Sequence, residues 1–237
     1  MKKITRTLLV GISALVALGT LSACSGGSSN QATSSSETPT TATTTAAPTA
    51  FPASGRYIAD MTAPDGKTMT IGISVDGDQV AAYACNGTDD EAWFFGNQAD
   101  GKIDIKSRFR DTLNAEFDGA NVEGDLNMNG VAYQFTAAPV SGEAGMYTAE
   151  LDGIRASWVV REDGSAIGVQ FGTSSVGDIT QAEIQQLNDA QFRAEVRNKR
   201  QLQQAQQITR LSNGKMSSKI NGQDVTPTLV NGSFRLG

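Results

Sequence analysis

From Gly55 to about residue 172 the chain alternates apolar and polar residues, and Asp-Gly or Asn-Gly dipeptides interrupt the alternation at short intervals. Alternation with a period of two is typical of β-strands that bury one face, and these dipeptides favour the tight turns of β-hairpins. A two-residue turn at Asn129-Gly130, for example, places Leu126 opposite Tyr133, so that apolar residues of both strands share one face. The pattern predicts about eleven strands in a mainly β, antiparallel meander that forms a β-barrel or a two-sheet sandwich.

Other turns predict the pairing of neighbouring strands in the same way. The predicted pairs are Tyr147 with Trp158 across Asp152-Gly153, Trp158 with Val169 across Asp163-Gly164, and Lys106 with Glu116 across a loop at 110–112. A slip of one residue would set apolar residues opposite polar ones, so we expect one buried face and one polar face throughout.

Residues typical of a helix follow the alternating stretch. Thr180-Gln181-Ala182-Glu183 has the form of a capping box, and Asn213-Gly214 supplies a stop signal. The pattern predicts one helix of about 30 residues, roughly 45 Å long, whose thin apolar stripe packs on the β-domain. Renewed alternation over 215–230 around Asn221-Gly222 predicts a terminal hairpin.

Residues 1–23 have the layout of a secretory signal, with the cationic residues Lys2, Lys3 and Arg6 before an apolar run over 8–18. The run is about half as long as a membrane-spanning helix. It ends at Leu21-Ser22-Ala23-Cys24, which resembles the lipobox of bacterial lipoproteins. The resemblance implies that Cys24 receives a diacylglyceryl group, with acyl chains such as palmitate, and that the signal is cleaved between Ala23 and Cys24. An uncleaved signal anchor with an incidental cysteine is the alternative.

Residues 25–54 are almost all Ser, Thr, Ala, Gly and Pro, with one charged residue, Glu37. Such a composition cannot build a core, and it predicts a disordered tether. The Thr- and Pro-rich part over 38–49 is a candidate for O-glycosylation, and a bare tether is the alternative. The predicted organisation is a signal peptide over 1–23, a lipidated cysteine and tether over 24–54, an antiparallel β-domain over 55–175, and the helix with its hairpin over 176–237.

The amino-acid composition excludes several kinds of catalytic and metal-binding site. The chain has no histidine and two cysteines among its 237 residues, which excludes His-dependent catalytic triads and His-ligated metal sites. The net charge is −6 and becomes −9 when residues 1–23 are removed, because they hold three basic and no acidic residues. An acidic body argues against nucleic-acid binding. We expect no cofactor and no bound metal.

A second resemblance lies in the body of the chain. A strand that ends in Ala82-Tyr83-Ala84-Cys85-Asn86-Gly87 is followed by a strand with Trp93, and later by an alternating stretch over 131–147. This arrangement resembles a β-rich domain of actinobacterial envelope lipoproteins, over about 70–170. The resemblance implies a compartment outside the cytoplasm but no particular activity.

Three groups of residues are candidates for chemistry or contact. Cys85 lacks a nearby base that could make it a nucleophile, so a structural role is favoured over a redox or catalytic one. The acids Asp76, Asp78, Asp89, Asp90 and Glu91 are interpreted as solvated turn residues, with a cation site as the alternative. Trp93, Phe94 and Phe95 are consecutive, so at least one must point away from the core, where it is covered by the helix or forms a ligand mouth or contact patch.

The basic residues Arg193, Arg197, Lys199 and Arg200 form a cluster on the predicted helix. They are interpreted as a solvated face, as partners for the domain's own acids, or as a contact site for an anionic lipid, wall polymer or protein. Arg193, Arg197 and Arg200 are the expected contacts if a partner binds the helix.

The function favoured by these features is non-enzymatic. We expect a lipoprotein anchored in the cell membrane, at its extracytoplasmic face, that serves as a binding or interaction module. Its partners would be the membrane, through the lipid anchor, and an envelope protein, lipid or wall polymer. A carrier of a small apolar ligand in a barrel cavity is the alternative, and an enzyme is less favoured since no nucleophile–base pair stands out. The sequence leaves the oligomeric state open.

Overall fold

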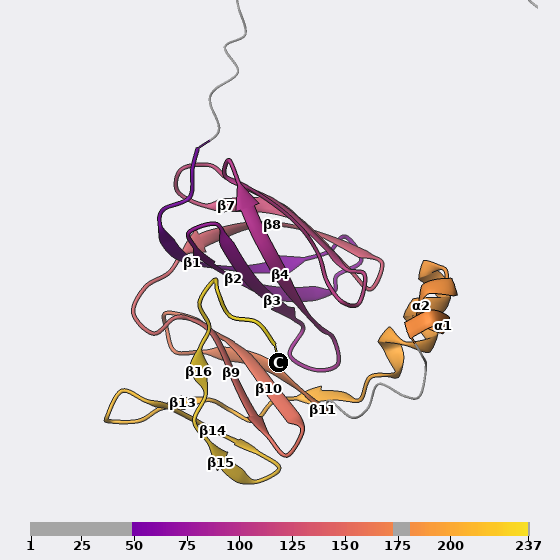
Figure 1. Cartoon of the computed structure of the whole chain (residues 1–237). Coiled ribbons are helices and arrows are strands. Elements are labelled where there is room, and N and C mark those ends of the chain that lie inside the picture. The colour runs from indigo at the N-terminus through magenta and orange to yellow at the C-terminus, as the bar shows by residue number, and fades with distance from the viewer. Residues whose placement is uncertain (1–48, 173–180, 237) are drawn as a thin grey trace, which may run out of the picture. The chain divides into compact units, whose positions relative to one another are not determined.

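The computed structural model describes residues 49–172 and 181–236 (Figure 1). The signal, the lipobox with Ala23 and Cys24, and most of the tether lie outside the described residues. All the strand pairs and buried clusters below belong to one compact unit, which begins at Ala46. Because this unit contains its own core, we expect residues 46–237 to fold without the residues that precede them.

Eight antiparallel strands, each paired with the next along the chain, close into a barrel. The barrel closes where Ile58 of the first strand pairs with Ala138 of the last. Closure leaves no free sheet edge, and it settles the choice between barrel and sandwich for this part of the chain. The strands are β1 (Ser54–Thr62), β2 (Thr68–Asp76), β3 (Gln79–Cys85), β4 (Glu91–Ala99), β5 (Lys102–Lys106), β6 (Thr112–Phe117), β7 (Val122–Met128) and β8 (Val131–Pro139).

The interior of the barrel is filled by apolar side chains. Alternate residues of the strands point inward, as the sequence pattern predicts, and Ile71, Phe94, Leu113 and Leu126 are at most 1% exposed. Together with their neighbours they form one continuous buried cluster. Phe51 also belongs to this cluster, since it stacks on Phe117 with 4.8 Å between ring centroids. The end of the predicted tether is therefore part of the packed domain.

Three further strands continue the meander into a second sheet, so that eleven strands lie between Ser54 and Gly172, in agreement with the prediction. This sheet has the order β12-β11-β10-β9-β16, and a small sheet of order β13-β14-β15 lies beyond it in the chain (Figure 1). The strands are β9 (Gly145–Leu151), β10 (Ile154–Val160), β11 (Ala166–Gly172), β12 (Leu202–Gln204), β13 (Thr209–Arg210), β14 (Met216–Ile220), β15 (Gln223–Val225) and β16 (Thr228–Leu229).

The second sheet packs against the outer face of the barrel at β2 and β3. A Cβ atom at Gly72 would lie 2.5 Å from Cγ of Met146, so only glycine permits this approach. The outward-facing Ala81, Tyr83 and Cys85 are consequently buried in a cluster with Met146 and Val159. The prediction of a polar outer face is therefore wrong for these two strands.

Two of the predicted hairpins have the expected register. Leu126 pairs with Tyr133, and Tyr147 pairs with Trp158. The terminal hairpin around Asn221-Gly222 is also present, as the pair β14–β15.

Two other registers differ from the prediction. Across Asp163-Gly164, Val169 pairs with Ser157 rather than with Trp158. The prediction assumed one polar face, whereas both faces of β10 are covered, by the barrel and by a cluster that includes Ile208 and Ile220. Glu116 pairs with Lys102, not Lys106, because the backbone N–H of Ser107 donates to Asp111 O (2.8 Å) and closes the loop over 108–110, two residues earlier than predicted.

The predicted long helix is wrong. The described residues contain two short α-helices, α1 (Gln181–Gln186) and α2 (Asp189–Glu195), and a turn of 3₁₀-helix, η2 (Arg197–Lys199). Asn188 separates the two helices because it forms a capping box with Gln191, in which Asn188 Oδ1 accepts from the Gln191 backbone N–H and Gln191 Oε1 accepts from that of Asn188. Beyond η2 the chain becomes β12, whose backbone bonds to β11 replace those of a longer helix.

Candidate functional site

The three consecutive aromatic residues of β4 divide between the two faces of the barrel wall. Phe94 points inward and is fully buried. Trp93 and Phe95 lie on the outer face, stacked with 5.5 Å between ring centroids, and Phe234 packs against both. Two of the three aromatic side chains therefore point away from the barrel core, where at least one was predicted, and the C-terminal segment packs on them instead of a helix.

The basic cluster does not form an exposed helix face. Arg193 is partly exposed and lies close to Gly130, whereas Arg197 and Arg200 are buried, at 2% and 7% exposure. Both buried arginines contact acidic residues or backbone carbonyls of the barrel. Of the interpretations left open by the sequence, pairing with the domain's own acids describes Arg197 and Arg200.

Asp111 holds Arg197 in place. Its carboxylate accepts from Arg197 Nε (3.0 Å), from Ser107 Oγ (3.0 Å) and from the backbone N–H of Asn129 (3.0 Å). Removal of one partner from a buried ion pair costs about 3–5 kcal/mol, because it leaves the other charge without compensation. This group of contacts therefore fixes the segment after α2 onto the barrel.

Asp90 gives Arg197 a second carboxylate. Asp90 Oδ1 lies 2.7 Å from Arg197 Nη1 and forms an ion pair with it. Burial raises the pKa of Asp90, and the charge of Arg197 opposes this rise. The same carboxylate lies 3.7 Å from Arg200 Nη2 and connects the two arginines.

Glu91 and Arg155 form a second buried pair, between the barrel and the second sheet. Arg155 Nη2 donates to Glu91 Oε1 (3.0 Å), and the Glu91 side chain is 2% exposed. Arg200 Nη2 donates to the backbone carbonyl of Glu91 (3.0 Å), and its guanidinium lies 4.0 Å from the ring centroid of Phe109. Burial lowers the pKa of Arg200 to about 10, with a further contribution from the charge of Arg197.

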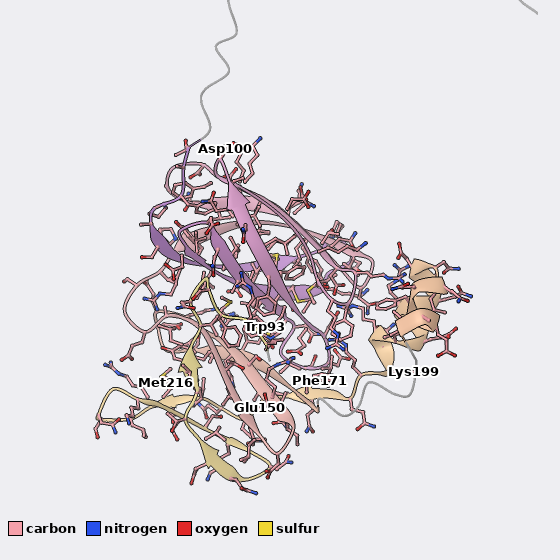
Figure 2. The ribbon with its side chains drawn as sticks, in the orientation of Figure 1. Trp93, Asp100, Glu150, Phe171, Lys199 and Met216 are labelled. Atoms are coloured by element: carbon pink, nitrogen blue, oxygen red, sulfur yellow. The ribbon has the colours of Figure 1, made fainter. Side chains whose placement is uncertain are left out.

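A cavity of about 310 Å³ lies beside this pair, and we call it the Trp93 pocket. In Figure 2, Trp93 lies between the barrel strands and the second sheet, and Phe171 lies on the second sheet. The walls come from β4, the loop after β5, strands β10 and β11, and the C-terminal segment. The lining residues are Glu91, Ala92, Trp93, Phe95, Lys106, Arg108, Phe109, Arg155, Phe171, Arg200, Arg235 and Leu236.

Polar atoms buried at the Trp93 pocket have no hydrogen-bond partner. They are the donors Trp93 Nε1, Arg155 Nε and Arg200 Nη1, and the acceptor Glu91 Oε2. Most buried polar groups in proteins are hydrogen-bonded, and an orphan donor or acceptor costs about 1–3 kcal/mol. Four such atoms on one pocket make it the strongest candidate for a ligand site in the described part of the chain.

A larger hollow lies on the other side of Arg200, with a volume of about 630 Å³. Its most polar wall is the loop after β3, where Asn86 Oδ1 accepts from the backbone N–H groups of Thr88, Asp89 and Asp90 at 2.9–3.0 Å. These groups satisfy one another, so the loop is held as a turn.

Cys85 lies on the outer face of β3, fully buried. Burial raises the pKa of its thiol to about 12. A thiol that stays protonated at neutral pH is a poor nucleophile, so this position agrees with the predicted structural role.

The candidate acids separate into two kinds. Glu91 is buried and Asp90 is partly buried (15% side-chain exposure), both beside arginines and contrary to the interpretation as solvated turn residues, whereas Asp76, Asp78 and Asp89 are exposed. Within 49–172 and 181–236, no group of three or more acidic, Cys or His residues could hold a metal ion.

The sequence analysis missed most of the pocket. Phe109, Arg155, Phe171 and Arg235 were not identified as site residues. The one sequence feature that could have indicated the site was Glu91, an acidic residue at the start of a strand rich in aromatic residues. A charged side chain that is buried in such a strand needs a partner of opposite charge. No pattern of spacing indicates that this partner is Arg155, 64 residues later.

Comparison of the chain with models of protein families, with curated proteins and with solved structures finds no match. The helices of the described residues include none whose length and hydrophobicity suffice for crossing a membrane.

Proposed function

We propose that this protein is a lipoprotein of the bacterial cell envelope, anchored through Cys24 at the extracytoplasmic face of the cell membrane, and that it acts as a non-enzymatic binding module. The signal layout over 1–23 and the lipobox support the anchor. The Trp93 pocket supports the binding role and is the proposed ligand site.

The observation that carries the binding role is the set of orphan polar atoms on an aromatic pocket. Ligand sites are concave, mostly apolar and furnished with a few convergent polar groups. The volume of about 310 Å³ is at the lower end of the usual range of roughly 300–1,000 Å³. A small molecule, or one part of a larger one, suits such a space.

The chemistry of the pocket favours binding over catalysis. Its one carboxylate, Glu91, is already paired with Arg155, and the one thiol among the described residues is buried and has a raised pKa. The alternative of a carrier with its ligand inside the barrel has less support, since packed side chains occupy the barrel interior. We therefore place the proposed ligand site in the Trp93 pocket, on the outer face of β4, and not inside the barrel.

Fluorescence of N-phenyl-1-naphthylamine, a neutral aromatic probe, tests the proposed site on residues 46–237. We expect saturable binding to one site, accompanied by quenching of Trp93. Phe109→Ala removes part of the apolar wall and should weaken binding about tenfold, which corresponds to the loss of about 1.4 kcal/mol of apolar burial.

Leu211→Ala is the matched control, because Leu211 is an exposed apolar residue (45%) outside the pocket. It should leave the affinity unchanged. Equal effects of both substitutions would show that the pocket is not the ligand site.

A further inference from the structure

We propose that the ligand of the Trp93 pocket is an amphipathic anion, a small apolar body joined to a carboxylate or phosphate group. This inference rests on the proposed binding function and specifies its ligand class. It is carried by the charge balance of the pocket and by the polarity of its orphan atoms.

The pocket is strongly cationic in an acidic protein. Five basic side chains line it against one carboxylate, that of Glu91, while the whole chain has a net charge of −6. A cleft that is lined by one sign of charge and has apolar walls concentrates the field and attracts the opposite charge. The basic residues are Lys106, Arg108, Arg155, Arg200 and Arg235.

Internal ion pairs leave most of this charge without compensation. Arg155 pairs with Glu91, and the nearest carboxylate to Arg200 is that of Asp90, at 3.7 Å, which already contacts Arg197 at 2.7 Å. Neither Lys106 nor Arg108 forms an ion pair with another described residue. Both are exposed at the pocket, where they can meet an incoming anion.

The orphan atoms have the polarity that an anion requires. Trp93 Nε1, Arg155 Nε and Arg200 Nη1 are donors, and the carboxylate or phosphate oxygens of a ligand would accept from them. The side chain of Arg200 is 1% exposed and Trp93 is 6% exposed, so a ligand in the pocket reaches these donors only when neighbouring side chains shift. Glu91 Oε2, the single orphan acceptor, suits a hydroxyl or N–H group on the same ligand.

The apolar part of the ligand is set by the rings around these donors. Trp93 and Phe95 form one wall, and Phe109 and Phe171 form others. An inorganic anion would leave these rings without contact, and a neutral hydrocarbon would leave the donors unpaired. A molecule with both parts satisfies the whole pocket.

A pair of fluorescent probes tests the inference on residues 46–237. 1-Anilinonaphthalene-8-sulfonate has the same aromatic body as N-phenyl-1-naphthylamine, with an added sulfonate. We expect the sulfonated probe to bind at least tenfold more tightly, and we expect its affinity to fall with added salt. Lys106→Gln combined with Arg108→Gln should remove most of this advantage and weaken binding of the neutral probe much less.

Lys102→Gln is the matched control for charge. Lys102 is exposed on the same strand as Lys106 but does not line the pocket. If it weakens the sulfonated probe as much as the pocket substitutions do, the attraction is diffuse and the inference is wrong. If the neutral probe binds and the sulfonated one binds no better, the inference fails while the proposed function stands, and if neither binds, the proposed function fails as well.

Displacement of the sulfonated probe then separates two sources of the same chemistry. Laurate below its critical micelle concentration represents a free carboxylate, and phosphatidylglycerol vesicles represent an anionic lipid headgroup. Displacement by either one supports the proposal and identifies the source. Displacement by neither overturns the assignment to carboxylate and phosphate amphiphiles.

Discussion

At the scale of single residues, the protein places several charges where water hardly reaches. Arg197 and Asp111 satisfy each other through two short contacts, and Asp111 accepts two further hydrogen bonds. Buried atoms without a hydrogen-bond partner occur in both places, since Arg197 Nη2 is one of them. Four of the seven such atoms in the described residues belong to residues that line the Trp93 pocket, and this concentration makes the pocket the stronger candidate for a ligand site.

Cys85 provides a pH-dependent test at this scale. The pKa of its thiol is raised from 9.0 to about 12 by burial. Below pH 9 the thiol is protonated in both the folded and the unfolded chain. Between pH 9 and about 12 the unfolded chain loses this proton and the folded chain keeps it, so the free energy of unfolding should fall by about 1.4 kcal/mol per pH unit.

The measurement is urea unfolding of residues 46–237 at pH 7.5 and pH 10. The native sequence should lose about 1.4 kcal/mol more than Cys85→Ala on this change of pH. Tyr83, whose pKa is also raised by burial, is present in both proteins and does not contribute to the difference. Equal losses would mean that the thiol is not held protonated by the fold.

At the scale of elements, turns and caps decide where strands and helices end. Asn129 and Gly130 have φ values of 52° and 79°, as the predicted tight turn between β7 and β8 requires. The helix prediction failed for a reason of the same kind. Asn188 favours a new start within the helical stretch, and after η2 the chain pairs with the edge of β11 instead of continuing as an exposed helix.

Gly130→Val tests the turn. A β-branched residue is strained at positive φ, so we expect the substitution to lower the free energy of unfolding by about 1–3 kcal/mol. Gly130→Asn is the control of similar bulk, because asparagine tolerates the left-handed conformation, and it should cost much less. Thermal unfolding of the two variants beside the native sequence measures the difference, and a Gly130→Val protein with an unchanged Tm contradicts the turn assignment.

At the scale of the whole molecule, the proposal joins a lipoprotein signal and lipid anchor to a folded domain. With residues 1–23 removed the net charge is −9, and anionic headgroups repel such a body. A covalent lipid anchor overcomes this repulsion, because each buried CH₂ contributes about 0.8 kcal/mol. The proposed ligand class is consistent with this position, since amphipathic anions are constituents of the membrane surface.

Cys24→Ala tests the anchor in the full chain. The thiol is the proposed acceptor of the lipid, so the substitution should block both lipid attachment and signal cleavage. Intact mass and partition into detergent give the measurement. Cys85→Ala is the matched control and should be processed normally, whereas a processed and membrane-retained Cys24→Ala protein would refute the anchor.

The sequence by itself determined the local structure of the β-domain. Turn dipeptides and alternation are properties of adjacent residues, and they led correctly to eleven strands, to the register across Asn129-Gly130 and to the terminal hairpin. The sequence also indicated a candidate contact site at Trp93, Phe94 and Phe95, because three consecutive aromatic residues cannot all face the same side of a strand.

Only the tertiary structure decided which strands are buried on both faces and which charged side chains contact each other. The second sheet covers the outer faces of β2 and β3, so the expectation of one polar face is wrong there. The same expectation gave the wrong predicted pairing of β10 with β11. The Trp93 pocket joins Glu91 to Arg155 and Arg200, which are distant in the chain. Periodicity reports the two sides of one strand and carries no information about what packs on either side, so such a site is specified only when the chain has folded.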